Sequence, residues 1–335
     1  MINAYAAMRA GADLEPFQYA PNDLGSMSVE IEISHCGICH SDLHLIDNDW
    51  SVSAYPLVPG HEIVGTITGI GNAVRHLRIG QRVGVGWLAG SCMACEQCLN
   101  GNENLCRQAQ PTCIGRHGGY ASSVIVDARF ALAIPEVLKP EHAAPLLCAG
   151  ITVFAPLRRQ RLNAKARVGI VGVGGLGHLA LQFARAMGYS VTAFSTSMNK
   201  QEEARGFGAD RFIDTSAPGA LNGEASSCDF ILSTVSADLP WLEYLNLLKP
   251  NGHLCIVGAS PGELRVPVFP LIEAQKSIGG SAIGSNAELA AMLDFSAEHK
   301  ISPLVECFTM TDANAAMARL RKNQLRYRAV LVNDR

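Results

Sequence analysis

The stretch that decides the fold is Arg167–Gly188, which reads RVGIVGVGGLGHLALQFARAMG. An apolar run leads into glycines spaced G-x-G-x-x-G, and an amphipathic helical pattern follows them. In that strand–turn–helix setting Gly172 makes a tight turn, Gly174 lets the backbone approach a pyrophosphate, and Gly177 packs the helix against the strand. With the helix N-terminus facing the phosphates, the stretch predicts a dinucleotide site, and the alternative is a glycine-rich turn with no ligand. The predicted cofactor-binding residues of the turn are Gly172, Gly174, Gly175, Leu176 and Gly177.

Two kinds of pattern divide the chain near Ala149–Gly150. Before that point, short runs rich in β-branched residues, such as VEIEISHC and EIVGTITGI, alternate with glycine and proline and predict a mostly β unit. From Arg167 onward apolar strands alternate with helical patterns, which predicts a parallel sheet covered by helices on both faces. A helix after Asn286 and the terminal strand in YRAVLV fit either unit.

Composition excludes several classes of partner. The 335 residues are 48% hydrophobic and carry a net charge of −3, which is ample apolar material for two domains. No cluster of lysine and arginine offers a surface for nucleic acid or an anionic membrane, and no uncharged stretch is long enough to span a bilayer. The N-terminus, MINAYAAMRAGADLE, lacks the pattern of an export signal. With 11 cysteines and no such signal, we expect a reduced protein in the cytoplasm.

Four cysteines share the short stretch SCMACEQCLNGNENLC, at the spacing C-x2-C-x2-C-x7-C. Short gaps of this kind let several thiolates face one centre, as a tetrahedral Zn²⁺ requires. Four cysteine ligands leave no position for a substrate, so the predicted zinc ion is structural and pins a loop that has little core of its own. The alternatives are unrelated thiols or disulfides. The predicted ligands are Cys92, Cys95, Cys98 and Cys106.

A second concentration of metal-binding residue types lies in HCGICHSDLH, and His61 and Glu62 follow further along the chain in GHE. Another cysteine, Cys148, lies in PLLCAGITVF just before the dinucleotide unit. Two thiolates and one imidazole leave the fourth position of a zinc ion open for water or a substrate oxygen, as in catalytic zinc sites.

The strand after the glycine turn, VTAF, ends in hydroxyl residues where a binder of NAD usually has an acidic residue. Hydroxyls and an ammonium group suit the 2′-phosphate of NADP(H), which a carboxylate would repel. We therefore expect Lys200→Ala to weaken NADPH binding alone. The alternative is a helix N-cap followed by a surface lysine. The predicted phosphate contacts are Ser195, Thr196, Ser197 and Lys200.

Across its whole length the chain resembles the zinc-dependent medium-chain alcohol dehydrogenases, and more narrowly their cinnamyl alcohol dehydrogenase branch and the bacterial NADPH-dependent aldehyde reductases. The resemblance is carried by CGICHSDLH, YPLVPGHE, the four-cysteine stretch, PLLCAGITVF, GVGGLG and FSTS. It implies a GroES-like catalytic domain of residues 1–149 and 287–335, a Rossmann domain of residues 150–286 that binds NADP(H), and a cleft between them. It also implies two zinc ions per chain and a homodimer that pairs through the strand near Ser277–Gly284.

The resemblance assigns the zinc ligands residue by residue. Cys39, His61 and Cys148 are implied as the catalytic set, and Cys39 matches rather than Cys36 because the tetrad Cys-His-Ser-Asp begins there. Glu62 is implied to approach the zinc ion when water exchanges. The other cysteines are expected to be buried core thiols, namely Cys36, Cys113, Cys228, Cys255 and Cys307.

Other matched positions concern the proton and the cofactor. Ser41 is implied to bond the substrate oxygen, and His44 is implied to pass the proton to solvent. Asp42 is implied to orient a zinc ligand, although the same residue could simply cap a helix. His40 and Arg328 match basic contacts to the pyrophosphate.

The implied reaction is reversible hydride transfer from NADPH to aldehydes over a broad aliphatic and aromatic range, giving primary alcohols. Trp50 and Trp87 are candidates for an apolar wall of the substrate site, or else belong to the core. One alternative is an NAD-dependent alcohol dehydrogenase working in the oxidative direction, which the hydroxyl loop disfavours. The other is a non-enzymatic redox or metal sensor, which would have no use for Ser41 and His44.

Overall fold

The computed structural model describes residues 1–260 and 262–333, and this part of the chain divides into two compact units. The first unit joins Met1–Ile151 to the segment that begins at Ile283, and the second unit is Thr152–Ala282. The late helix and the terminal strand, which the sequence pattern left open, therefore lie in the first unit. None of the described helices is long and apolar enough to cross a membrane.

The central strand of the first unit, β3 (Ser28–Ile38), leads directly toward helix α1 (His40–Asp47). Buried and less buried side chains alternate over its first six residues, as expected of a strand with one buried side, and its last three residues are all buried. It pairs antiparallel with β4 (Ile63–Ile70), and in this register Cys36 lies opposite Ile63. Residues just after β3 and just before β4 therefore meet at one end of the sheet.

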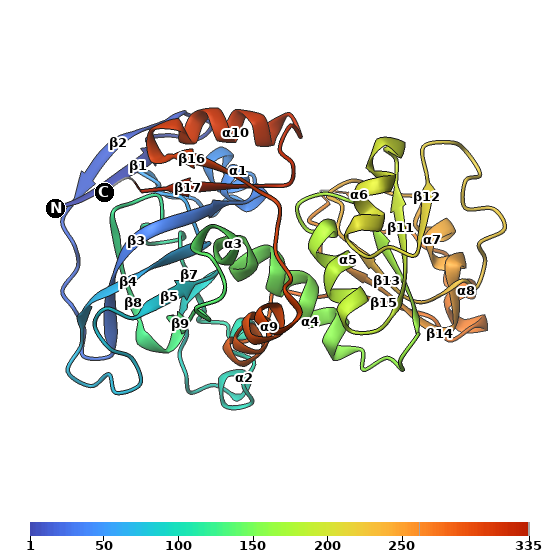
Figure 1. Cartoon of the computed structure of the whole chain (residues 1–335), viewed down its shortest axis with the longest axis horizontal. Helices are drawn as coiled ribbons and strands as arrows, with labels where there is room; N and C mark the ends of the chain where they lie inside the picture. Colours follow the sequence, from blue (N-terminus) through green and yellow to red (C-terminus); the bar gives the residue numbers. More distant parts are fainter. Residues whose placement is uncertain (261, 334–335) are drawn as a thin grey trace. The chain divides into compact units, whose positions relative to one another are not determined.

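The C-terminal strand β17 (Arg328–Val332) lies on the other side of β3. Ala329 pairs with Ile38, the last residue of β3. Arg328 therefore lies next to the point where β3 ends and α1 begins. β17 also pairs in parallel with β16 (Val305–Thr309), and α10 (Ala313–Arg321) packs on both strands (Figure 1).

Strand β16 explains why one expectation about the cysteines is wrong. Cys36, Cys113, Cys228 and Cys255 are buried as expected, but Cys307 is exposed. β16 is an edge strand in the described sheet, and none of its residues is fully buried, Cys307 at its centre being the exposed one. The apolar character of the strand does not reveal which face a given residue occupies.

A helical segment carries the chain past Cys148. Helix α3 (Pro140–Pro145) leads directly into a π-helical turn, η3 (Leu146–Gly150), every residue of which is buried. Helix α9 (Asn286–His299) packs against this turn.

The rest of the first unit completes one large sheet and two small ones. Among the described residues the large sheet has the order β16-β17-β3-β4-β5-β9, with β8 added on β3, while β1 pairs with β2 and β6 with β7. The remaining elements are β1 (Ile2–Ala7), β2 (Leu14–Tyr19), β5 (Arg82–Val85), β6 (Leu88–Gly90), α2 (Glu96–Leu99), η1 (Glu103–Leu105), β7 (Gln110–Pro111), β8 (Ser123–Asp127), η2 (Ala128–Phe130), β9 (Leu132–Ala133) and η5 (Met310–Asp312).

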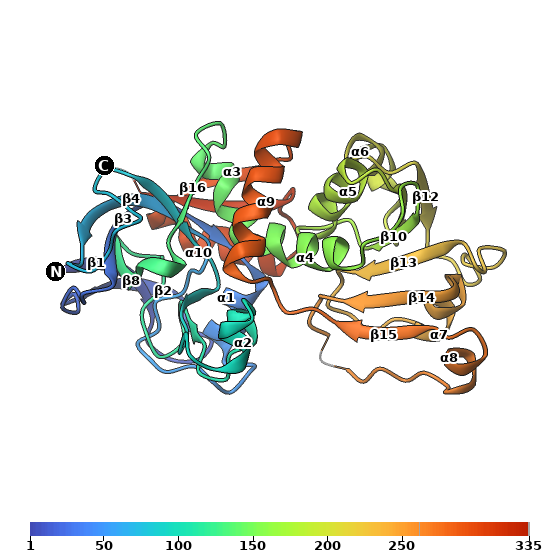
Figure 2. The same ribbon diagram turned by 90° about the horizontal axis from the view of Figure 1, so that it is seen from below.

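The second unit is built on a parallel sheet, whose order over the described chain is β12-β11-β10-β13-β14-β15. Counted along this unit the order is 3-2-1-4-5-6, that of the doubly wound Rossmann fold, which confirms the predicted fold class. Figure 2 shows β13, β14 and β15 side by side. The elements are α4 (Ile151–Arg159), β10 (Arg167–Val171), α5 (Gly177–Ala186), β11 (Ser190–Ser195), η4 (Met198–Lys200), α6 (Gln201–Gly206), β12 (Arg211–Asp214), β13 (Cys228–Ser233), α7 (Trp241–Leu247), β14 (Leu248–Ile256), α8 (Phe269–Glu273) and β15 (Ser277–Gly280).

Candidate active site and metal centres

Three elements bring metal-binding side chains together beyond the end of β3. Cys39 is the N-cap of α1, His61 precedes β4, and Cys148 lies in η3. The sulfurs of Cys39 and Cys148 lie 4.0 Å apart, and one ligand atom from each of these residues and from Glu62 lies within 4.8 Å of the others. Zinc–sulfur bonds of about 2.3 Å in a tetrahedron put two sulfurs about 3.8 Å apart, so the geometry fits zinc.

The ring of His61 is buried and is oriented by Asp42. Nδ1 of His61 lies 3.0 Å from Oδ1 of Asp42, and both side chains are fully buried. Within the described chain, Nε2 of His61 has no hydrogen-bond partner. A buried ring nitrogen without a hydrogen-bond partner, next to two thiols, is what a zinc site requires, because zinc binds imidazole and thiolate ligands. In such sites a carboxylate commonly holds the other ring nitrogen, as Asp42 does here.

Asp42 supports both the helix and the ligand. Its Oδ2 accepts the N–H of Cys39 at 2.9 Å, which completes a capping box at the start of α1. Its Oδ1 also accepts the N–H of Gly60 at 3.0 Å, just before the ligand His61. The two alternatives raised by the sequence, a helix cap and an orienting carboxylate, thus both describe contacts that this residue makes.

The electrostatics distinguish Cys39 from the neighbouring thiol of Cys36. A hydrogen bond with Cys148 outweighs burial and lowers the pKa of Cys39 well below the usual range of a thiol. Burial and the charge of Asp42 instead raise the pKa of Cys36. The same hydrogen bond raises the pKa of Cys148, so the two sulfurs share one thiolate. Position is what identifies the candidate ligand, because Cys39 and not Cys36 lies in the cluster with His61 and Cys148.

Glu62 and Arg328 form a buried ion pair beside the candidate ligands. Nη2 of Arg328 contacts Oε1 of Glu62, and the side chains are 5% and 0% exposed. Burial raises the pKa of Glu62 to about 7, against the opposing charge of Arg328. The carboxylate fits only because Gly37 lacks a side chain, since a Cβ there would lie 1.9 Å from Oε2 of Glu62. Contact of Arg328 with cofactor phosphates, and approach of Glu62 to zinc, stay predictions.

The two residues expected to move a proton lie on α1. Oγ of Ser41 is 3.7 Å from Sγ of Cys39. Nδ1 of His44 is 2.7 Å from Oδ2 of Asp49, a residue that the sequence pattern did not single out. Asp49 follows the left-handed C-cap Asn48 (φ 59°), which turns the chain back toward the helix. The sequence signal that could have identified Asp49 is its position, since it is an acidic residue just after the helix that carries His44.

Two tryptophans lie around these side chains. The ring of Trp87 is 4.9 Å from that of His61, edge to face, and 6.2 Å from that of Trp50. Trp50 is 5.2 Å from the ring of His44 and is 37% exposed, so it is no core residue. Both rings therefore lie beside functional side chains, and Trp87 also packs against the core of the first unit. That they wall a substrate site stays a prediction.

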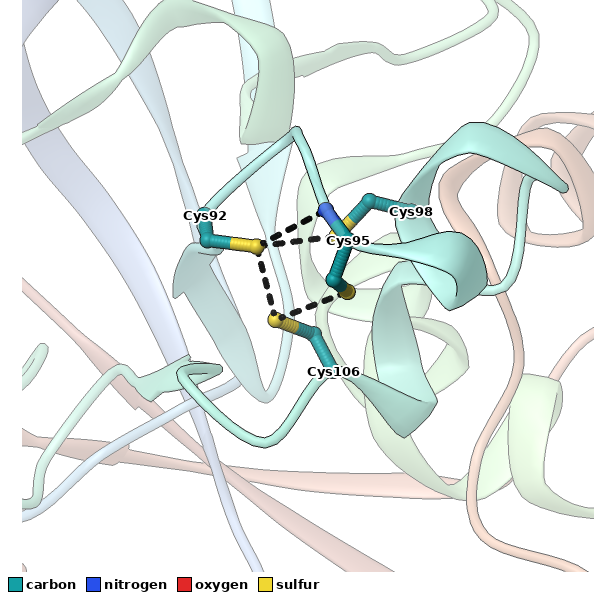
Figure 3. Close-up of side chains that lie close together, drawn as sticks. All are labelled: Cys92, Cys95, Cys98 and Cys106. Carbon is teal, nitrogen blue, oxygen red and sulfur yellow. Dashed lines mark hydrogen bonds between the residues drawn. The ribbon is translucent and has the colours of Figure 1, made fainter.

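The four-cysteine stretch closes on itself as a second candidate metal centre. Figure 3 shows the side chains of all four cysteines turned toward one another. The sulfur–sulfur distances include 3.5 Å, 3.8 Å and 3.8 Å, near the tetrahedral value of about 3.8 Å and far beyond a disulfide bond of about 2 Å. Backbone N–H groups of Cys95 and Gln108 donate to the sulfurs of Cys92 and Cys106, both at 3.3 Å. The arrangement excludes the disulfide alternative and fits a closed structural site.

The glycine turn after β10 shows three different reasons for its glycines. Gly172 has φ 92°, which favours glycine, and a Cβ on Gly177 would lie 1.9 Å from the carbonyl oxygen of Gly172. A Cβ on Gly174 would meet nothing within 4 Å. Backbone conformation therefore favours glycine at the first position and packing demands it at the third. The second position is open, which would let a ligand come close to the backbone. Gly175 and Leu176 complete the turn before α5.

The hydroxyl loop after β11 lies against this turn. Nζ of Lys200 donates to the carbonyl oxygen of Val173 at 2.7 Å, which joins the loop to the turn. Oγ of Ser195, which is buried, accepts the N–H of Ser197 at 3.2 Å, while Thr196 is exposed. His40 belongs to the first unit and is exposed at the start of α1. That these residues contact a cofactor stays a prediction.

Comparison with known proteins places the chain in a family. Residues 25–136 match the alcohol dehydrogenase GroES-like domain, and residues 175–298 match the zinc-binding dehydrogenase family. The chain is 44% identical over 335 residues to the aldehyde reductase AdhA of Synechocystis sp., with 100% of both chains covered.

Two solved structures are similar over nearly the full chain. A cinnamyl alcohol dehydrogenase from Sorghum bicolor superposes with a TM-score of 0.95 at 39% identity, covering 99% of this chain and 97% of that one. The CAD of Helicobacter pylori complexed with NADP(H) superposes with a TM-score of 0.90 at 32% identity and the same coverage.

The chain therefore belongs to the zinc-dependent medium-chain alcohol dehydrogenase family, in its cinnamyl alcohol dehydrogenase branch. Its class of reaction is oxidoreduction between small-molecule alcohols and aldehydes, as the resemblance implied.

Proposed function

We propose that the protein is an NADPH-dependent aldehyde reductase, reversible and broad in its aliphatic and aromatic substrates, with two zinc ions per chain. The observation that carries the proposal is the buried set of Cys39, His61 and Cys148, with the unpartnered Nε2 of His61 among the described residues. The kinship to an aldehyde reductase and to a cinnamyl alcohol dehydrogenase supports the substrate class. A cytoplasmic location remains part of the proposal.

The residues of this chain divide the work of the reaction. When bound, zinc supplies a Lewis acid for the carbonyl oxygen and NADPH supplies the hydride. Cys39, His61 and Cys148 would hold the metal, and Asp42 keeps the imidazole turned toward it. Trp87, edge to face with the ring of His61, would contribute apolar surface beside the metal-binding side chains.

Proton delivery follows from the geometry of α1. Ser41 lies beside a metal ligand, where its hydroxyl can donate to the substrate oxygen. Asp49 engages Nδ1 of His44, so Nε2 is the nitrogen that exchanges the proton. The path we propose runs from solvent through Nε2 of His44 to the hydroxyl of Ser41.

The residues at the end of β11 and after it support a preference for NADPH. The strand ends at Ser195, so no carboxylate is present there to bond the ribose hydroxyls of NADH. Ser195, Thr196, Ser197 and Lys200 would surround the 2′-phosphate. His40 and Arg328 stay candidates for contacts to the pyrophosphate.

The test is to measure initial rates with NADPH and NADH over a panel of aldehydes and the metal content of the same sample. We expect reduction of several aldehydes with NADPH, much weaker rates with NADH, and two zinc ions per chain. Equal rates with both cofactors would refute the NADPH assignment and leave the zinc chemistry standing. No turnover with a full complement of zinc would favour the sensor alternative.

A change at the proton path should affect turnover more than binding. We expect His44→Ala to lower kcat by about 10²–10⁴-fold with partial rescue by small buffer bases, and Asp49→Asn to lower it by a smaller factor and change the pH profile of kcat. Asp47→Asn is the matched control, because Asp47 at the end of the same helix pairs with Arg321 at 2.7 Å and not with His44. Unchanged kcat and pH profile in His44→Ala would remove that residue from the mechanism.

The open edge of the second unit carries a proposal about assembly. β15 ends the described parallel sheet. In the segment before it, the N-cap Val268 and two residues of α8, Phe269 and Ile272, are 67%, 68% and 66% exposed. An unpaired edge beside exposed apolar side chains is a surface that a second copy can cover. We propose a homodimer that uses this surface.

Light scattering at micromolar concentration should give twice the chain mass of 35.7 kDa. Phe269→Asp should give a monomer, because it adds a charge to the surface that dimerisation buries. Val137→Asp is the control, since Val137 is 71% exposed in the first unit and should not matter. A monomeric mass for the unaltered protein would contradict the proposal.

A further inference from the structure

The four-cysteine stretch is joined to helix α9 through a buried carboxylate. Glu103 lies in η1, between the cysteines Cys98 and Cys106, and is only 7% exposed. Its Oε1 accepts the backbone N–H of Asn286, the first residue of α9, at 2.6 Å. A carboxylate at this place satisfies an N–H that the helix itself leaves unpaired and meets the positive end of the helix dipole.

The helix's own cap does not perform this task. Oγ of Ser285 accepts the N–H of Glu288 at 3.3 Å, and the side chain of Glu288 accepts the N–H of Ser285 at 2.9 Å. This capping box satisfies the N-cap and third positions, whereas the N–H of Asn286 is bonded by Glu103. The start of α9 is therefore complete only when the loop between the cysteines is in place.

The other side of α9 packs on the segment that carries Cys148. Met292 of α9 is fully buried, and its Sδ is 3.2 Å from the position that a Cβ on Gly150 would occupy. Gly150 is the last residue of η3, two residues after Cys148. The Met292 side chain thus fills the space beside Gly150, and α9 packs against η3 there, so a shift of α9 would change the packing of η3.

We propose that Glu103 is a positioning residue through which the four-cysteine centre holds Cys148 in place to bind the second metal ion. The chain of contacts is the cysteine loop, Glu103, the first turn of α9, Met292 and η3, all within the first unit. The inference rests on the proposed function, because it takes Cys148 as a zinc ligand. According to this inference, the four-cysteine centre stabilises its own loop and also supports metal binding by Cys39, His61 and Cys148.

The test uses the full chain loaded with cobalt, whose visible spectrum differs between a site with four thiolates and one with two thiolates and an imidazole. We follow cobalt loss to a chelator from each site by its own spectrum. Glu103→Ala should speed release from the site of Cys39, His61 and Cys148 by about tenfold and leave the four-cysteine site loaded. Glu103→Gln keeps an acceptor but no charge and should fall between. Glu96→Ala, at an exposed residue of the same loop, should behave as the unaltered protein.

A double-mutant cycle separates coupling from general loosening. Cys95→Ser removes a ligand of the four-cysteine centre and should also speed cobalt release from the other site. In the Glu103→Ala background Cys95→Ser should add no further acceleration, because the link is already broken. Additive effects would overturn the proposal, and so would an unchanged release rate in Glu103→Ala.

A second variant tests the link from its other end, in case Glu103→Ala fails to fold. Met292→Val shortens the side chain that contacts η3 and should accelerate cobalt release from the Cys148 site alone. Equal acceleration at both sites, or none, would count against the inference. An unaltered protein with no cobalt spectrum at Cys39, His61 and Cys148 would refute the proposed function itself, which distinguishes the two failures.

Discussion

Replacing Cys39 with alanine should lower turnover by about a thousandfold or more and remove one of two zinc ions, while the fold stays largely intact. The size of the effect reflects the loss of a Lewis acid worth several kcal/mol, at about 1.4 kcal/mol per tenfold in rate. Cys148→Ala and His61→Ala should behave in the same way. The measurements are metal content, initial rate with NADPH and an aldehyde, and the free energy of unfolding in denaturant.

The chain offers matched controls for this prediction. Cys36→Ala removes a fully buried thiol from the end of β3 that lies outside the candidate metal clusters of the described residues, and it should keep both zinc ions and most of the activity. Cys95→Ser should differ from Cys39→Ala by a clear loss of unfolding free energy, because a structural zinc contributes folding free energy directly. Loss of both metals in Cys39→Ala, or full activity, would contradict the division into two sites.

The second large effect should follow from Ser195→Asp. The substitution removes a hydroxyl from the proposed phosphate site, adds a like charge beside the 2′-phosphate, and offers an acceptor to the ribose of NADH. One charged hydrogen bond is worth about 1.5–3 kcal/mol, which is about ten- to a hundredfold in kcat/KM. The added repulsion should shift the NADPH/NADH ratio of kcat/KM toward NADH by about a hundredfold or more.

Ser195→Ala is the control, because it loses the hydroxyl without adding charge and should lower the NADPH efficiency by the smaller factor alone. A ratio that does not move in Ser195→Asp would place the 2′-phosphate elsewhere. The structure changes the expectation for Lys200→Ala. Since Nζ of Lys200 donates to the carbonyl of Val173, its loss should loosen the turn and weaken NADH binding as well as NADPH binding.

Features that lie close together in the chain could be predicted from the sequence by itself. The spacing of the four cysteines predicted one closed centre, because a loop this short brings all four thiols within reach of a single ion. The run Arg167–Gly188 predicted a strand, a glycine turn and a helix in succession, and these are β10, the turn and α5. In both cases the physical constraint acts over a few residues, so the pattern carries it.

Only the tertiary structure decided which distant residues meet. Cys39 and Cys148 are 109 residues apart, and their pairing came from family resemblance; what joins them is the register of β3 on β4 and the packing of η3. The contact between Asp49 and His44 was not predicted, because it depends on a left-handed turn at Asn48 that residue spacing does not reveal. Arg328 reaches Glu62 across 266 residues because β17 pairs beside β3. Glu103 reaches α9 across 183 residues. Strand register and helix packing depend on the whole core, which local spacing does not encode.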